Sequence, residues 1–143
     1  MEDQREKTVD QACAVPFRIN LGRPEFCLIS RGNDGRWDFP KCLVADGSSQ
    51  FSELRRVLEQ AGLLCEVECT DPLDEFSASK VDQADQITAF LVRVENEVEV
   101  NPESQIHRRR WCFPEEAKVR IRRKPVRHLI DLAVRQLNGG PIR

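Results

Sequence analysis

One group of residues that could do chemistry is the set of cations in segment 107–127. This segment contains nine Lys or Arg residues and two acids, Glu115 and Glu116. The preceding stretch, 66–103, has eleven Asp or Glu residues and two basic ones. The net charge of −2 therefore conceals a strong asymmetry along the chain. Two interpretations stay open: the basic segment helps to hold a polyanion, or the two segments form solvated faces of opposite charge.

Cysteines are the second group with chemical potential. The chain has six: Cys13, Cys27, Cys42, Cys65, Cys69 and Cys112. Only Cys65 and Cys69 lie close together, and no second pair completes a zinc motif with them. Because most of these cysteines sit among apolar residues and the first fifteen residues lack the apolar stretch of a secretory signal, we expect buried, reduced thiols. Cys42 stands next to Lys41 and is also a candidate reactive thiol.

Length and composition limit the class of protein. A chain of 143 residues predicts one domain. The 40% apolar and 32% charged residues exclude a disordered tail, and no run approaches the ~20 apolar residues of a membrane span. A pI near 5.8 argues against a generally basic nucleic-acid binder, so duplex nucleic acid is not an expected partner. We expect a cytoplasmic domain over 13–138, a flexible segment over 1–12 and a tail over 139–143.

These groups need elements to position them, and the clearest is a helix over 49–61. Its apolar residues, at intervals of three, three, one and three, form one stripe: Phe51, Leu54, Val57, Leu58 and Ala61. Ser48 or Ser49 can cap its start and Gly62 can end it.

Strands and two further helices complete the prediction. Strands are predicted over 14–20, 25–31, 63–69 and 87–94, and 98–100 is a candidate for another. A short helix is predicted to open at Pro114, and a longer one to cover 126–137. The alternation predicts a mixed α/β domain.

Residues 37–63 carry a resemblance to a known family. They begin with Trp37-Asp38-Phe39-Pro40-Lys41 and end in a helix closed by Gly62-Leu63. This segment resembles the signature loop and helix of the Nudix hydrolase superfamily, a W-x-F-P-K run followed by the R-E-U-x-E-E-x-G-U box. The order of the remaining strands, with R-R-W-C-F-P-E-E-A at 109–117, is similar to the diadenosine tetraphosphate hydrolase branch. The resemblance implies an α/β/α sandwich whose mixed sheet lies between helices 49–61 and 126–137.

The resemblance also implies a site, although the box is degenerate. In the family, three helix glutamates at i, i+3 and i+4 gather Mg²⁺ or Mn²⁺. The corresponding positions here hold Arg56, Glu59 and Gln60. Glu59 and Gln60 are thus the candidate metal ligands, and Glu59 with the box arginine Arg55 are the candidate catalytic residues. Cys42 stands near the leading glycine, and the following glutamate is missing.

Four cations are candidates for binding the substrate: Arg31, Lys41, Arg56 and Arg110. Glu103 could replace a lost acid, whereas Glu53 lies six residues before Glu59 and is expected on a different face of the helix. Trp37 could pack against the sheet or stack on a base.

Three functions follow. The first is a weak, metal-assisted hydrolase acting on a nucleoside diphosphate linked to another moiety. The second is a catalytically inactive domain that binds a nucleotide or polyphosphate as a sensor, with Arg56 neutralising phosphate directly. The third is an interaction module that reuses the fold, and a homodimer is compatible with each.

Overall fold

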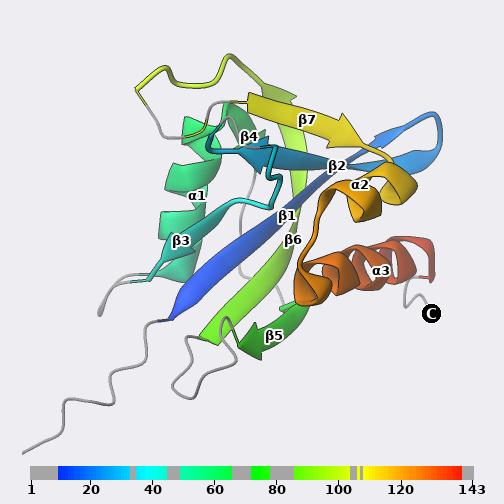
Figure 1. Ribbon diagram of the computed structural model, residues 1–143. Helices are drawn as coiled ribbons and strands as arrows, with labels where there is room; N and C mark the ends of the chain where they lie inside the picture. The colour runs from blue at the N-terminus through cyan, green and yellow to red at the C-terminus, as the bar shows by residue number, and fades with distance from the viewer. Residues whose placement is uncertain are drawn as a thin grey trace, which may run out of the picture.

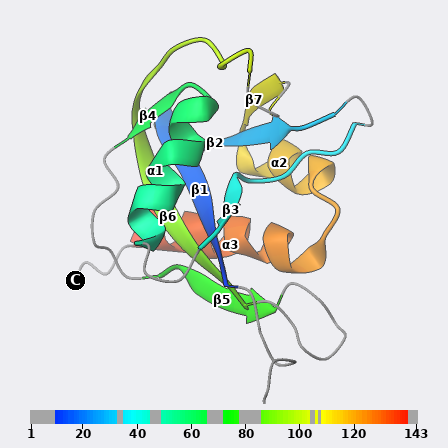
Figure 2. The same ribbon diagram turned by 90° about the vertical axis from the view of Figure 1, so that its left-hand side faces the viewer.

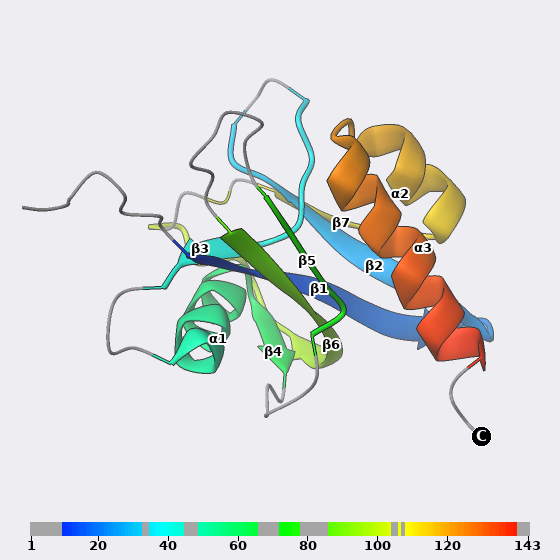
Figure 3. The same ribbon diagram turned by 90° about the horizontal axis from the view of Figure 1, so that it is seen from below.

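The computed structural model describes residues 10–32, 35–44, 49–65, 72–77, 86–103, 106 and 108–139. In the described residues, a curled, mixed sheet lies between one helix and a pair of helices (Figures 1 and 3). The strands are β1 (Gln11–Asn20), β2 (Arg23–Ser30), β3 (Lys41–Leu43), β4 (Leu63–Cys65), β5 (Asp74–Ser77), β6 (Gln86–Glu97) and β7 (Arg108–Cys112). The helices are α1 (Gln50–Gln60), α2 (Pro114–Arg120) and α3 (Lys124–Gly139).

Two long central strands organise the sheet, whose order is β4-β6-β1-β2-β7. β1 and β6 run parallel, with Ala12 opposite Thr88, whereas β1 and β2 form an antiparallel hairpin. β3 pairs with the first residues of β1, and β5 pairs with the first residues of β6. The β1–β2 turn places Leu21 and Gly22 at positive φ, which is the backbone that a tight hairpin turn of this kind requires.

Alternation along the strands builds two apolar cores, one on each face. In β1, Cys13, Val15 and Phe17 join the core beneath α2 and α3. The intervening residues Ala12 and Ala14 join the core beneath α1. Figure 3 shows the same division, with α1 on one side of the sheet and α2 and α3 on the other. The predicted α/β/α sandwich is confirmed.

The predicted helix over 49–61 is also confirmed. α1 begins after Ser49, whose hydroxyl accepts hydrogen bonds from the amides of Phe51 and Ser52. Leu54, Val57, Leu58 and Ala61 are buried as the stripe predicts, while Phe51 is half-buried against Phe90, with ring centroids 5.0 Å apart. Gly62 follows the helix with φ +78°.

Several boundaries differ from those predicted. Gln11 and Ala12, expected in a flexible segment, belong to β1 because they pair with Leu43 and Cys42. Residues 98–100 form no strand, since the Val98 amide instead donates to the carbonyl of Gly62. α3 is longer than 126–137 at both ends. β3, β5 and β7 were missed because short strands give little periodicity. Residues 66–69 of the predicted strand 63–69, and Ser48, lie outside the described part of the chain.

None of the described helices is long and apolar enough to cross a membrane.

Candidate functional site

A cavity of about 420 Å³ opens where α1, β3 and the end of β2 meet. Its lining residues are Arg31, Lys41, Cys42, Leu43, Arg56, Val57, Gln60, Glu103 and Ile106. Figure 2 looks onto the side of the molecule where these elements lie next to one another. The structure thus brings together six of the residues singled out from the sequence: Arg31, Lys41, Cys42, Arg56, Gln60 and Glu103. We call this cavity the cationic pocket, because three of its four charged lining residues are cations.

Arg56 reaches the cationic pocket from the second turn of α1. Its Nη2 donates a hydrogen bond to Glu53 Oε1, one turn earlier, at 2.6 Å. This bond raises the pKa of the Arg56 guanidinium above its ordinary value. Glu53 therefore contributes to the candidate site, which was not predicted from the sequence. From the sequence alone Glu53 was compared with Glu59, whereas its partner is Arg56, three residues further along the helix.

Lys41 and Arg31 enter the cationic pocket from β3 and from the residue that follows β2. The Lys41 ammonium is 2.5 Å from Asp38 Oδ2, and its side chain is only 14% exposed. The same Asp38 side chain accepts a hydrogen bond from the Phe39 amide at 2.8 Å. Arg31 approaches the carbonyl of Lys41, with Nη2 and oxygen 3.5 Å apart. Lys41 is thus fixed in place, whereas Arg31 is exposed.

The residues at the cationic pocket do not fit the divalent metal that the resemblance implies. Among its lining residues, the oxygen donors are one amide, Gln60, and one carboxylate, Glu103, and three cations surround them. Glu59, the other expected metal ligand, is exposed and is not a lining residue. Over the described ranges no three His, Cys, Asp or Glu side chains gather into a possible metal site. Hard cations need several oxygen ligands, and nearby positive charge opposes them.

Two further candidates lie apart from the cationic pocket. Arg55 is exposed on α1 and is not a lining residue. Arg110 pairs with Leu28 across β2 and β7, which places it on the sheet face that carries α2 and α3. Its Nε donates to Glu116 Oε2 at 2.8 Å, which raises the pKa of Arg110. The structure gives Arg110 a partner on α2 and does not bring it to Arg31, Lys41 and Arg56.

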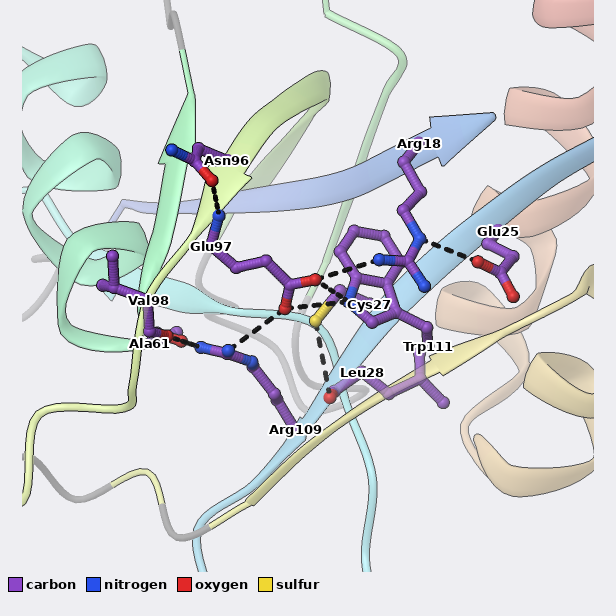
Figure 4. A network of polar contacts seen from close by, with 10 residues as sticks. All are labelled: Arg18, Glu25, Cys27, Leu28, Ala61, Asn96, Glu97, Val98, Arg109 and Trp111. Atoms are coloured by element: carbon purple, nitrogen blue, oxygen red, sulfur yellow. Dashed lines mark hydrogen bonds and ion pairs between the residues drawn. The ribbon is translucent and has the colours of Figure 1, made fainter. Parts of the chain in front are cut away.

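Arg109, its neighbour, points to the α1 face and holds the end of that helix (Figure 4). One guanidinium nitrogen, Nη1, donates to the carbonyl of Ala61 at 2.7 Å and to that of Val98 at 2.5 Å. The other, Nη2, lies 3.1 Å from Glu97 Oε1. Arg109 thus ties the turn that follows Gln60 to the segment that leads to Glu103. The alternation of side chains along a strand could have indicated this role of Arg109. It lies two residues before Trp111, which packs against the core beneath α1, so both side chains point to the same face of the sheet.

Glu97 joins Arg109 to the hairpin of β1 and β2 (Figure 4). Its carboxylate accepts from Arg18 Nη1 at 2.9 Å and from the Trp111 indole at 3.1 Å. The Arg18 guanidinium stacks on Trp111, 4.0 Å from the ring centroid, and its Nε donates to the buried Glu25. The charges of this network are all paired, which makes its role structural.

Trp37 begins the W-D-F-P-K run that ends in Lys41. Arg108 lies over it, 5.1 Å from the centroid, and the ring packs against the core beneath α2 and α3. Of the two roles open to Trp37, packing is the one that the structure shows.

The described cysteines are free thiols: Cys13, Cys27, Cys42, Cys65 and Cys112. Three are buried, as expected, and Cys42 is half-buried in the wall of the cationic pocket. Burial, followed by the charge of Glu53, raises the pKa of the Cys42 thiol to about 11. A reactive thiol needs the opposite shift, so the raised pKa argues against a reactive Cys42. Cys69 lies outside the described residues.

Solved structures resemble this chain, although no family model and no curated protein matches it. An Ap4A hydrolase of C. elegans, in a binary complex, superposes with a TM-score of 0.74 at 19% identity, over 92% of this chain and 99% of that one. The NUDIX domain of Shewanella oneidensis NrtR, complexed with ADP ribose, gives a TM-score of 0.68 at 14% identity, over 95% and 94%. The E. coli ORF135 protein gives 0.66 at 19% identity, over 97% of both chains.

These structures superpose on nearly the whole chain, although their sequences differ from it at most positions. Identities below a fifth establish a common fold and leave the chemistry to the residues at the site. The agreement covers both layers of helices and the mixed sheet between them. The chain has the fold of the Nudix hydrolase superfamily.

Proposed function

We propose that this domain binds a nucleotide or another polyphosphate in the cationic pocket, through its own cations. One observation carries the proposal: Arg31, Lys41 and Arg56 come from three separate elements and line one cavity. Guanidinium groups bind phosphate oxygens with two parallel hydrogen bonds, and lysine contributes a point charge. Such a set performs the charge neutralisation that a divalent ion performs in a metal-dependent site.

The carboxylates near the cationic pocket support this role. Asp38 and Glu53 are bonded to Lys41 and Arg56 and fix them, yet neither is a lining residue of the cavity. Glu103 is the single acid in its wall. Cations that are held before the ligand arrives lose less conformational entropy on binding.

Calorimetric titration with ADP tests the proposal. We expect binding in buffer that contains EDTA, unchanged by Mg²⁺, and an affinity that falls as the salt concentration rises. Arg135→Gln on α3 serves as the control for the loss of one surface charge. Binding that requires Mg²⁺ contradicts the proposal, and so does the absence of binding in either buffer.

Metal-assisted hydrolysis of a nucleoside diphosphate derivative is the second candidate. It is supported by the fold that the chain shares with a solved Ap4A hydrolase, and Gln60 and Glu103 are the oxygen-bearing side chains that the pocket wall would contribute. Release of product from diadenosine or nucleoside-diphosphate substrates, measured with Mg²⁺ or Mn²⁺, tests it. Activity that is lost in Glu59→Gln or Glu103→Gln supports the hydrolase, whereas metal-independent binding without turnover supports the first proposal.

A further inference from the structure

A second cavity adjoins the cationic pocket. It has a volume of about 270 Å³ and is lined by Ile29, Arg31, Gly32, Arg36 and Asp38. Arg31 lines both cavities and therefore stands between them. The second cavity is formed where Asp38 bridges back to β2: the amides and carbonyls of Ile29 and Asp38 exchange two hydrogen bonds, of 2.8 and 3.0 Å.

The charge of the second cavity continues that of the cationic pocket. Two of its three charged lining residues, Arg31 and Arg36, are cations. The third, Asp38, is bonded to Lys41 and to the Phe39 amide, so its negative charge is already compensated. Together the two cavities present Arg56, Lys41, Arg31 and Arg36 to a ligand, with Glu103 as the one acid that lacks a cationic partner among the described residues.

Among the residues that the structure describes, neither cavity is lined by a Phe or Trp ring on which a base could stack. All seven Phe and both Trp residues of the chain lie in the described ranges, and the chain has no Tyr. None of these rings is among the lining residues of either cavity, where the apolar residues are aliphatic. Proteins that select a nucleobase commonly stack it on an aromatic side chain.

We infer that the two cavities form one binding site for a chain of phosphates, in which the number of phosphates determines the affinity and the nucleoside contributes little. Arg56 and Lys41 bind one end of the chain, Arg31 its middle and Arg36 its other end. This inference rests on the proposed function and specifies its ligand class.

Titration with inorganic pyrophosphate, inorganic tripolyphosphate and ATP, in EDTA, tests the inference. We expect tripolyphosphate to bind at least about tenfold more tightly than pyrophosphate, since it reaches cations of both cavities. ATP, which carries the same number of phosphates, should bind within about threefold of tripolyphosphate. ATP that binds far more tightly than tripolyphosphate would show recognition of the nucleoside and overturn the inference.

Two variants test how the phosphate chain is oriented across the two cavities. Arg36→Gln is expected to weaken tripolyphosphate about tenfold and to leave pyrophosphate unchanged, whereas Arg31→Gln weakens both. Arg135→Gln, the control on α3, is expected to change neither, which separates a built site from general attraction to a basic surface. Equal losses in all three variants contradict the inference.

The two proposals can fail separately. If ADP binds but pyrophosphate and tripolyphosphate bind equally well, the phosphate-chain inference is wrong and the proposed function stands. If no phosphate compound binds, both are wrong.

Discussion

Nη2 of Arg56 lies 2.6 Å from Oε1 of Glu53, one helical turn away on α1. This pair occupies the side of the helix that faces the cationic pocket, where the Nudix family places carboxylates for a metal ion. A carboxylate in the same helix thus serves to hold a cation of the protein. Under the proposed function, this relationship turns a site for a positive ion into a site for a negative one, without any change of fold.

Arg56→Gln should weaken the metal-free binding of ADP or tripolyphosphate about ten- to a hundredfold, because it removes a charge-assisted, two-pronged contact with phosphate. Calorimetry measures the affinity. The thermal midpoint should change little, since the Arg56 side chain is 60% exposed. An affinity equal to that of the Arg135→Gln control would show that Arg56 does not contact the ligand.

The double variant Arg56→Glu, Gln60→Glu reverses the charge of the pocket wall. It places two new carboxylates beside Glu103 and removes one of the three cations. We expect measurable Mg²⁺ binding by calorimetry, absent from the parent protein, together with loss of metal-free phosphate binding. Arg135→Glu, on α3, controls for the charge reversal of one surface arginine. A double variant that still binds phosphate in EDTA and takes up no Mg²⁺ would mean that these positions do not decide which ion the site accepts.

Much of the fold could be predicted from the sequence, because elements of about ten residues are long enough for their pattern of apolar residues to be recognised. The stripe of α1 and the alternation of β1, β2 and β6 give both cores. The three-residue β3 and the five-residue β7 carry too little pattern, and their pairing depends on neighbours that are distant in sequence.

The site was predicted in part. Lys41, Arg56 and Gln60 could be singled out because the family motif over 37–63 contains them, and Arg31 because it lies just before that segment. Glu53 and Arg36 were missed because their roles depend on partners: one fixes Arg56, and the other enters a cavity formed only when Asp38 pairs with Ile29. Arg110 rather than Arg109 is the sequence-based candidate because three consecutive arginines do not show which of them points to which face of the sheet. Only the register of β7 on β2 shows this.

Arg109→Leu should lower the free energy of unfolding by about 2–4 kcal/mol. The variant leaves the carbonyls of Ala61 and Val98 and the carboxylate of Glu97 without their shared partner. Urea denaturation measures the change, and Arg109→Lys should recover part of it. Arg110→Leu is the matched control, because Arg110 is exposed and pairs only at the surface. Equal effects at the two positions would contradict the assigned role of Arg109.

Gly62→Ala should be destabilising by at least about 2 kcal/mol, for two reasons that combine. Gly62 has φ +78°, and an added Cβ would lie 2.2 Å from Arg109 Nη1 and 2.3 Å from the Val98 carbonyl. Gly22→Ala tests the backbone term alone, since Gly22 has φ +75° with open space around its Cα. We expect the larger loss at Gly62 in urea denaturation, and equal losses would show that the close approach of Arg109 has no energetic consequence.

Alkaline pH should destabilise the protein through its buried thiols. Burial raises the pKa of both Cys13 and Cys27 to about 12, from an ordinary value of 9.0. The folded chain therefore retains these protons at pH values where the unfolded chain has released them. The stability that they contribute is complete below about pH 9 and is lost as the pH rises from 9 toward 12, at about 1.4 kcal/mol per pH unit for each thiol.

Urea midpoints measured between pH 8 and pH 11 test this expectation. Lysine deprotonation also changes stability in this range, so the informative comparison is with Cys13→Ala, which removes one of these two thiols. The variant should be less stable than the parent at pH 8, because it leaves a small cavity, yet its stability should fall less steeply with pH. Parallel curves for the parent and the variant would place the alkaline loss elsewhere, because a thiol that stays protonated in the folded state must contribute its own slope.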